Sequence, residues 1–279
     1  MNSFYSIIFF SFCLVSCTTQ KLSIQFSEVS GIEQIEKDLY VLINDSGDGP
    51  YLYIVDPKGN IKKKVFVKGA KNVDWEDITF DGRNTLYVGD IGNNLNKRKD
   101  LAIYQIQIRS EIIPHLLYQD TIHAVKFSYQ YPDQEQFPPE NGNLNFDSEA
   151  LTYADGKLYI LSKNRTVLYN RICKVYECEF ENDKMNVRLS QQFKLKGMSW
   201  LMGSVTGCDF SNGMLYVLTY KRIYIFERNK DGFKMVKTKH LGRLQQWEGI
   251  CVESNNMLRI VAEKSLLGDQ KMKTIKLWN

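Results

Sequence analysis

The chain has 279 residues and a net charge of +4, with 43% hydrophobic and 24% charged residues. This length supports a substantial core, the lack of any low-complexity tract excludes a largely disordered protein, and the 13% aromatic content favours strands. The densest basic stretch, Ile61 to Lys71, is too short for the continuous basic face of a nucleic-acid-binding protein, so we expect no nucleic-acid partner.

The N-terminal segment has the features of an export signal. Residues Ile7 to Val15 form an apolar run that is shorter than the roughly 20 residues needed to span a bilayer and typical of a signal peptide. The following Leu14-Val15-Ser16-Cys17 resembles a bacterial lipobox, although no lysine or arginine precedes it. The resemblance implies that residues 1–16 are removed and that Cys17 is lipidated. We therefore expect an exported protein of the bacterial cell envelope, anchored to a membrane through lipid.

A strand–turn–strand module recurs along the rest of the chain. Asp-Gly, Asn-Gly or Asn-Asn pairs mark the turns, because these residues tolerate the positive φ of tight hairpins. The modules span Glu28–Leu42, Asp74–Asp90, Asp147–Leu161, Val205–Leu218 and Gln246–Val261.

One or two further strand-like runs follow each hairpin, as in Tyr51–Asp56 with Ile61–Val67 and Arg222–Glu227 with Phe233–Lys239. A four-stranded antiparallel unit repeated in a row is the blade of a β-propeller. The sequence therefore predicts an all-β chain, a β-propeller of four-stranded antiparallel blades. We count five blades, and six is the alternative.

The spacing of the modules affects the predicted number of blades, because one interval is long enough to hold an additional blade. The interval from Glu76 to Glu149 is long for one blade, and it holds a Pro- and Gly-bearing loop at Tyr131–Asn143, so an insertion is favoured over a hidden blade. The last module shows only three strands. We expect Leu22–Phe26 to supply its fourth and Thr18–Lys21 to form a short tether, so that residues 17–27 tether and close a propeller of residues 28–279.

The modules also place polar groups on one face. Glu76, Glu149 and Glu248 hold the same early position in three first strands, and Ser30 and Thr206 hold it in the other two. Polar loops that follow the second strands, such as Lys163-Asn164-Arg165, Tyr220-Lys221-Arg222 and Glu263-Lys264, should converge with them at the mouth of a central channel.

Three uses of this mouth are open. The carboxylates of Glu76, Glu149, Glu248 and Asp90 could ligate a hard cation such as Ca²⁺, which takes six to eight oxygens. They could instead accept hydrogen bonds that hold the ring closed, since a buried carboxylate needs such partners. The mouth could also be a polar pocket for an organic ligand. The remaining candidate rim residues are Asn44, Asp45, Trp75, Asp77, Asn93, Asn94, Arg98, Lys163 and Trp247.

Other metal or redox chemistry has little support. The mature chain would keep Cys173, Cys178, Cys208 and Cys251, with no CxxC pair and only scattered histidines, so a zinc site is not expected. A bridge between Cys208 and Cys251 is allowed but not implied. No cofactor other than Ca²⁺ is indicated.

Several motifs carry a family resemblance. Asn72–Ile78, Leu86–Asn94 with Arg98, and Asp147–Leu151 resemble a group of uncharacterised bacterial β-propeller lipoproteins, over roughly residues 28–170. This group is distantly similar to phytase-like, NHL-like and gluconolactonase-like propellers. Those relatives imply metal-assisted hydrolysis at a channel mouth.

Three functions remain open on these grounds. The leading hypothesis is a non-catalytic envelope protein that binds a small molecule or a protein at the rim, because no nucleophile–base signature is present. The alternative is a divalent-metal-dependent hydrolase of phosphate esters or lactones, with Lys163 or Arg98 holding an anionic substrate. The third is a structural scaffold.

Overall fold

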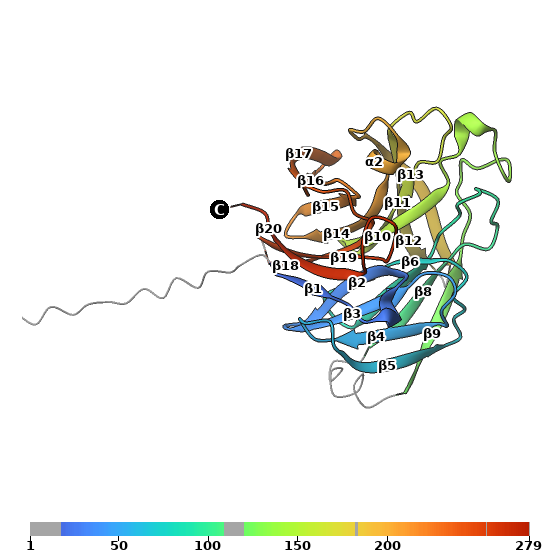
Figure 1. Cartoon of the computed structure of the whole chain (residues 1–279). Helices are drawn as coiled ribbons and strands as arrows, with labels where there is room; N and C mark the ends of the chain where they lie inside the picture. Colours follow the sequence, from blue (N-terminus) through green and yellow to red (C-terminus); the bar gives the residue numbers. More distant parts are fainter. Residues whose placement is uncertain (1–17, 109–119, 182–183, 255, 279) are drawn as a thin grey trace, which may run out of the picture.

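The computed structural model describes residues 18–108, 120–181, 184–254 and 256–278, and these are built almost entirely of strands and loops (Figure 1). The predicted signal peptide, residues 1–16, and Cys17 lie outside the described residues. Within the described part of the chain, no helix has the length and apolarity required to cross a membrane. The longest helix in that part is α2, Trp200–Gly203.

The described strands form four sheets, the largest of which has eight strands. This sheet consists of two antiparallel meanders, each of four strands. Meander 1 contains β2 Val29–Glu36, β3 Leu39–Asn44, β4 Tyr51–Val55 and β5 Ile61–Lys68, and meander 2 contains β6 Trp75–Phe80, β7 Thr85–Asp90, β8 Ala102–Gln107 and β9 Thr121–Ser128. The outer strands β5 and β9 pair in parallel and so join the two meanders.

Two further sheets are single antiparallel meanders of four strands. Meander 3 contains β10 Asp147–Ala154, β11 Lys157–Lys163, β12 Ile172–Glu181 and β13 Lys184–Lys194, and meander 4 contains β14 Val205–Ser211, β15 Met214–Thr219, β16 Arg222–Asn229 and β17 Gly232–His240. Their strand order follows the sequence order, as the repeated modules predict.

The last sheet joins the two ends of the described chain. Meander 5 contains β18 Trp247–Ser254, β19 Met257–Ala262 and β20 Lys271–Lys276, and its fourth strand is β1, Thr19–Lys21, antiparallel to β20 (Figure 1). The prediction of a strand at Leu22–Phe26 and a tether at Thr18–Lys21 was wrong. Ile24–Phe26 is a 3-10 helix, because Phe26 is fully buried and packs edge-on against Tyr53 with ring centroids 5.2 Å apart.

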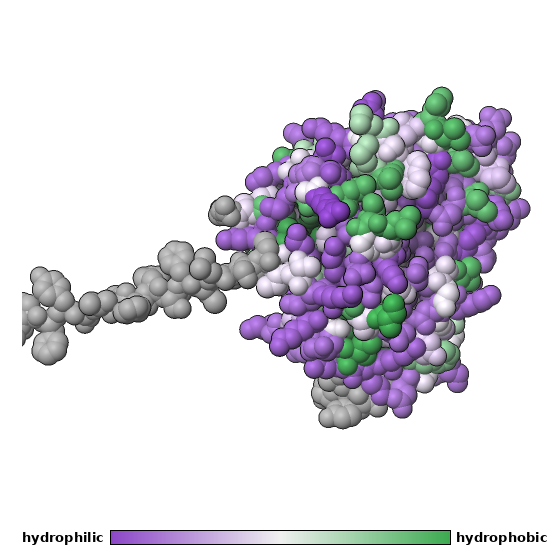
Figure 2. Space-filling view, viewed as in Figure 1, coloured by the Kyte–Doolittle hydropathy of each residue, from purple (hydrophilic) through white to green (hydrophobic). Residues whose placement is uncertain are grey.

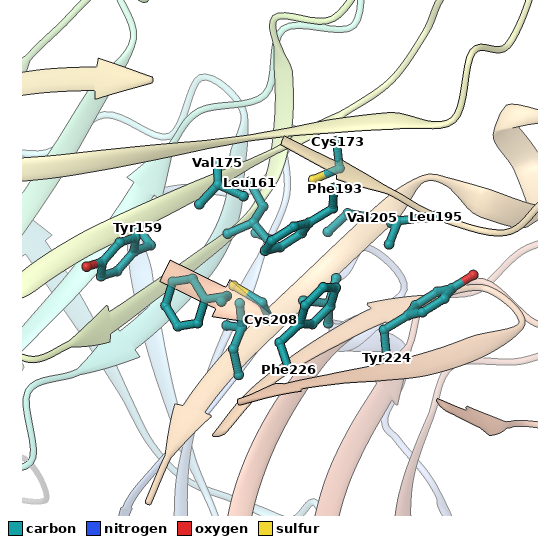
Figure 3. Close-up of a cluster of buried hydrophobic side chains, with 14 of the residues drawn as sticks. Tyr159, Leu161, Cys173, Val175, Phe193, Leu195, Val205, Cys208, Tyr224 and Phe226 are labelled. Atoms are coloured by element: carbon teal, nitrogen blue, oxygen red, sulfur yellow. The ribbon is translucent and has the colours of Figure 1, made fainter. Parts of the chain in front are cut away.

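The first strands of the meanders contact one another in a closed cycle. β2 contacts β6, β6 contacts β10, β10 contacts β14, β14 contacts β18, and β18 contacts β2. A hydrophobic cluster fills the space between each neighbouring pair of meanders. Figure 3 shows the cluster between meanders 3 and 4, where Leu161 and Val175 face Phe226. The core is therefore divided among the sheet interfaces.

The long interval between the second and third modules is an insertion. No strand lies between Ser128 and Asp147 in the structure, and the segment holds only a 3-10 turn at Asn141–Asn143. Residues 109–119, which also fall in this interval, lie outside the described residues.

The four cysteines of the described chain are all buried free thiols, so Cys208 and Cys251 do not form a disulfide. Cys173 and Cys208 lie in the cluster of Figure 3. Burial raises the pKa of the Cys173 thiol to about 12. A thiol of this kind packs as an apolar group and is a poor nucleophile.

The protein surface is mostly hydrophilic. Figure 2 shows hydrophilic residues over most of the visible face, with hydrophobic residues in small separate patches. The basic stretch Ile61–Lys71 contains the outer strand β5, whose Lys64 ammonium lies 3.7 Å from the centroid of the Tyr51 ring.

Candidate functional site at the channel mouth

A β-bulge interrupts the first strand of every meander close to its start. In each case the register with the second strand skips one residue. The skipped residues are the five equivalent positions of the sequence repeat: Ser30, Glu76, Glu149, Thr206 and Glu248. A bulge leaves its extra residue unpaired and re-aims its side chain, and bulges are common beside functional sites.

Close packing of neighbouring strands accompanies the bulges. A Cβ at Gly207 would lie 2.7 Å from the Glu248 carbonyl oxygen, and a Cβ at Gly249 would lie 3.0 Å from the Ile32 amide nitrogen. Glycine is needed at both positions because the next backbone approaches so closely. The bulged residues therefore sit on a tightly packed frame.

Four of the five bulged residues line one pocket of about 280 Å³. The pocket is polar, with carboxylates from several meanders and two basic side chains. Its lining residues are Ser30, Asp45, Glu76, Asn94, Glu149, Lys163, Arg165, Trp200, Leu201, Tyr220, Gln246, Glu248 and Glu263. The structure thus brings together Glu76, Glu149, Glu248, Asp45, Asn94 and Lys163, as the sequence predicted.

Asp45 and Glu76 of the pocket lining form a cluster of three carboxylates with Asp74, which does not itself line the pocket. Carboxylate oxygens of Asp45, Asp74 and Glu76 all lie within 4.8 Å of one another. Two oxygens bound to the same Ca²⁺ lie at most about 5 Å apart, because each Ca–O contact is about 2.3–2.6 Å. The cluster therefore has the dimensions of a cation site.

Gly92 makes this cluster possible. A Cβ at position 92 would overlap the Glu76 Oε1 and Asp74 Oδ2 atoms. In the observed arrangement, both carboxylates occupy the space that a side chain at position 92 would take. A side chain there would displace them from their present positions beside Asp45.

The pKa values of Asp74 and Glu76 show that few positive groups compensate their negative charge. Burial, with Asp45 nearby, raises the pKa of Asp74 to about 8. Burial also raises the pKa of Glu76 well above its usual range, and the charged groups that add most to this effect are the carboxylates of Glu149 and Asp45. With a pKa of about 8, Asp74 is mostly protonated at neutral pH. A bound cation would replace that proton.

The pocket lining also includes two basic groups. The buried Lys163 ammonium pairs with Glu149 and donates to the Tyr220 hydroxyl, 3.3 Å away. Burial opposes the charge of Lys163, but the nearby Glu149 carboxylate raises its pKa well above the usual value, so the ammonium stays charged. Arg165 Nε donates to Asp147 at 2.7 Å, and its guanidinium lies 5.4 Å from the ring centroid of Trp200.

Two buried polar atoms of the pocket lining have no partner among the described residues. One is Glu248 Oε2, whose companion oxygen accepts a hydrogen bond of 2.9 Å from the Tyr220 hydroxyl. The other is Ser30 Oγ. Burial raises the pKa of Glu248 well above its usual range, although Lys163 opposes this. Unsatisfied buried polar groups are rare in folded proteins, so these two point to something that the pocket binds.

Asp90 and Arg98 lie behind the pocket and not in it. Arg98 Nη2 donates to Asp90 Oδ1 at 2.8 Å, and its Nη1 donates to the Gly92 carbonyl at 2.8 Å. The Asp74 backbone amide also donates to Asp90 Oδ1, at 3.1 Å. This pair therefore fixes the backbone that carries Asp74 and Gly92, and neither member lines the pocket.

Other predicted rim residues are buried in the frame. The Trp75 indole nitrogen donates to the Lys71 carbonyl, and Asn93 donates to the Phe146 carbonyl. Asn44 donates to the Gln25 carbonyl and to Asp48. Trp247 is buried, with the Lys271 ammonium 5.5 Å from its ring centroid. None of these four lines the mouth pocket.

Asp77 belongs to a second, deeper set of acidic residues that bind backbone amides. Its carboxylate accepts from the amides of Ile78, Leu151 and Cys208, and so links meander 2 to meanders 3 and 4. Asp209 accepts from Val252 in meander 5 in the same way. This deeper set holds neighbouring meanders together, and Glu33 contributes to it through the Phe80 amide. At the mouth, Glu248 of meander 5 also links to meander 4, because it accepts from the Tyr220 hydroxyl.

Sequence reasoning missed Asp74, Gly92 and Trp200. Asp74 was readable in principle, because it stands two residues before the bulged Glu76 in an Asp-Trp-Glu run. No such signal marked Gly92 or Trp200. Gly92 matters only because it lacks a side chain, and Trp200 lies in the connection between meanders 3 and 4, outside the repeated modules.

No protein-family model matches this chain, and no curated protein matches it significantly in sequence. Solved structures do resemble it. A luciferin-regenerating enzyme has a TM-score of 0.53 at 12% identity, covering 94% of this chain and 95% of that one. A Myxococcus xanthus glutaminyl cyclase has a TM-score of 0.55 at 11% identity, covering 94% and 96%. A Streptomyces coelicolor aldose sugar dehydrogenase, bound to PQQ, has a TM-score of 0.51 at 8% identity, covering 94% and 98%.

These neighbours are β-propeller-like, and the chain therefore has an all-β, propeller-like fold, which confirms that part of the predicted fold class. Their names describe different chemistries. A fold shared at such low identity does not assign function, so the function is argued from the pocket.

Proposed function

We propose that the mouth pocket binds a hard divalent cation, such as Ca²⁺, and with it an anionic ligand. The carboxylate cluster of Asp45, Asp74 and Glu76 would hold the cation. The observation that carries this proposal is that three carboxylates meet within 4.8 Å beside a glycine whose missing side chain leaves room for them. The unpartnered oxygens of Ser30 and Glu248 in the same pocket support the binding of a ligand next to the cation.

The basic side chains of the pocket favour an anionic ligand. Lys163 and Arg165 line the same cavity as Asp45 and Glu76. A carboxylate or phosphate group could contact the bound cation on one side and a guanidinium N–H on the other. Trp200 and Leu201 would contact an apolar part of the ligand.

Apolar side chains around the mouth extend this contact surface. They stand on connections between strands at the end of the molecule where the pocket opens. The exposed ones are Ile24, Leu95, Val167, Leu168, Met198, Trp200, Leu201 and Leu266. Trp200 and Leu201 of this set line the pocket itself, and exposed apolar groups beside a polar pocket support the rim-binding role.

A second candidate function, hydrolysis of phosphate esters or lactones, is favoured by Glu248. Its Oε2 is buried and unpartnered, and the Tyr220 hydroxyl donates to the other oxygen, so a proton on this carboxyl group resides on Oε2. That proton could pass to a leaving oxygen and be regained from the attacking water. A divalent cation in the carboxylate cluster would supply Lewis acidity for this reaction.

We further propose that the propeller has five blades, which correspond to the five meanders. The closed cycle of contacts among their first strands supports this count. We also keep the proposal that the chain is exported to the bacterial cell envelope and anchored by lipid on Cys17, as the lipobox-like segment suggests.

The cation proposal is tested by thermal unfolding. After treatment with EDTA, Ca²⁺ at about 100 times its Kd should raise Tm by about 5–10 °C, because binding to the folded state alone adds about 2.7 kcal/mol. Mg²⁺ and Mn²⁺ titrations would show the preferred ion. Glu76→Gln and Gly92→Ala should lose most of the shift, the first by removing a ligand charge and the second by forcing the carboxylates apart.

Glu135→Gln is the matched control, since Glu135 lies outside the mouth pocket and should leave the Ca²⁺ shift intact. Melting curves of the wild type that are the same with EDTA and with every cation would refute the proposal. Hydrolysis is examined separately with an aryl phosphate and a simple lactone. Glu248→Gln should slow any turnover by about 10²–10⁴-fold while Ca²⁺ binding persists.

A further inference from the structure

A second cavity, independent of the mouth, lies between the insertion of residues 129–146 and meander 3. Its volume is about 530 Å³, within the range of small-molecule sites, and it shares no lining residue with the mouth pocket. The insertion is longer than the connections that precede β6, β14 and β18. A connection longer than about 12–15 residues without its own strands is usually functional or flexible.

The insertion is held firmly where it forms the cavity. Asp133 accepts from the Lys174 ammonium at 2.7 Å and from the Tyr176 hydroxyl at 2.9 Å. Gln134 donates to the Asn96 carbonyl at 2.8 Å, and the Lys174 ammonium lies 3.7 Å from the ring centroid of the buried Phe146. The floor of the cavity is therefore formed before any ligand arrives.

The cavity wall presents planar polar side chains that are exposed to solvent and point to no partner within the protein. They are the side chains of Glu135, Gln136, Glu140, Asn143 and Gln192. In the described part of the chain, no side-chain hydrogen bond or ion pair engages any of these five. Their carboxylates can only accept hydrogen bonds, whereas their carboxamides both donate and accept.

This donor and acceptor set selects a class of ligand. An anionic ligand would meet the carboxylates of Asp133, Glu135 and Glu140 against the single ammonium of Lys174. A polyamine would satisfy the carboxylates but leave the carboxamide N–H groups without acceptors. Hydroxyl groups donate and accept at once, so a ligand rich in hydroxyls can pair with every group. We propose that this cavity is a saccharide-binding site that takes a mono- or disaccharide.

The test uses nuclear magnetic resonance of the ¹⁵N-labelled chain with maltose, cellobiose, lactose and N,N′-diacetylchitobiose as probes. At least one should shift the amide signals of residues around the cavity and leave those of the mouth unchanged. Asn143→Ala should weaken the binding about tenfold, which corresponds to about 1.4 kcal/mol and to the loss of one or two hydrogen bonds.

Gly142→Tyr is a blocking variant that spares the fold. Gly142 lines the cavity, its φ is not in the left-handed region, and a Cβ there would meet nothing within 4 Å. This variant should abolish saccharide binding while the Tm and the Ca²⁺ response of the mouth stay at wild-type values. Glu76→Gln should lose the Ca²⁺ response of the mouth and keep saccharide binding. A failure of the saccharide proposal is therefore distinguishable from a failure of the cation proposal.

Three results would overturn the proposal: no probe shifts any cavity signal, the shifts map to the mouth, or spermidine binds the cavity while the saccharides do not.

Discussion

At the scale of single residues, two sets of buried acids do different work. The mouth set of Asp74 and Glu76 has few partners inside the protein, whereas Asp77 is saturated with backbone amides from three meanders. A carboxylate with its hydrogen bonds made is part of the frame, and one without them is available to a ligand.

Asp77→Ala should therefore destabilise the fold strongly. The change leaves the buried amides of Ile78, Leu151 and Cys208 without their acceptor. Each unsatisfied buried group costs about 1–3 kcal/mol, so we expect a loss of at least about 3 kcal/mol in urea-induced unfolding. Glu135→Ala, at a residue without such bonds, should change stability by less than about 0.5 kcal/mol. A similar small loss for Asp77→Ala would contradict the assigned role.

The pH dependence of stability follows from Asp209. Burial raises its pKa from 3.8 to about 7, and the amides of Val252 and Phe210 oppose this rise. Between these values the folded chain holds a proton that the unfolded chain has released, so stability falls as pH rises from about 4 to about 7. Urea unfolding across this range should show a shallower slope for Asp209→Asn than for the wild type. Equal slopes for the two proteins would exclude Asp209 as a cause of the pH dependence of stability.

Part of the site was predictable at this scale because repetition marks it. The equivalence of Glu76, Glu149 and Glu248 follows from the modules, and the bulges place all three in one pocket. The separation of Asp77 from Glu76 was not predictable. Adjacent residues in a strand normally point to opposite faces, but a bulge at Glu76 changes the side-chain directions locally. Because no sequence motif marks the bulge, the sequence alone does not show which of the two residues lines the pocket.

At the scale of elements, β1 shows where local pattern fails. The apolar run Leu22–Phe26 resembles a strand more than Thr19–Lys21 does, yet it is the polar segment that pairs with β20. Leu22 and Phe26 are instead buried in the cluster between meanders 1 and 5. The burial of Leu22 and Phe26 outweighed the strand propensity of this segment. The sequence alone does not show which of these two contributions is larger.

Removing residues 1–21 should destabilise the chain and promote aggregation. The deletion takes away β1 and leaves the edge of β20 unpaired, which is a template for other strands. We expect a lower Tm and a larger sedimentation coefficient than for a chain that lacks only residues 1–17. If the two truncated chains behave alike in both measurements, β1 is dispensable.

At the scale of the whole molecule, the fold was the most predictable property. Hairpins and strand runs repeat with similar spacing, and the sheets follow that order. The joining of meanders 1 and 2 through β5 and β9 was not foreseen, because parallel pairing between outer strands leaves no periodic signal. Ligand identity was beyond reach because it depends on side chains that meet only in three dimensions.

The envelope proposal has a direct test at this scale. In a bacterial host, the full chain should fractionate with membranes and Cys17→Ala should fractionate with soluble proteins, because the substitution removes the lipidated thiol. Cys13→Ala is the matched control and should stay with membranes. Equal distribution of all three chains would reject lipidation at Cys17.

The direction of β1 gives the molecule a definite orientation. β1 runs antiparallel to β20, and Leu22, after its end, bonds to Gln270, just before β20 begins. The β19–β20 connection that contains Gln270 belongs to the same end of the meanders as Glu263 of the mouth. Thr19 pairs with Lys273 in the middle of β20, so the chain enters β1 from the side away from the mouth. A lipid on Cys17 would therefore be attached on that side, and the pocket would stay accessible when the chain is anchored to the bilayer.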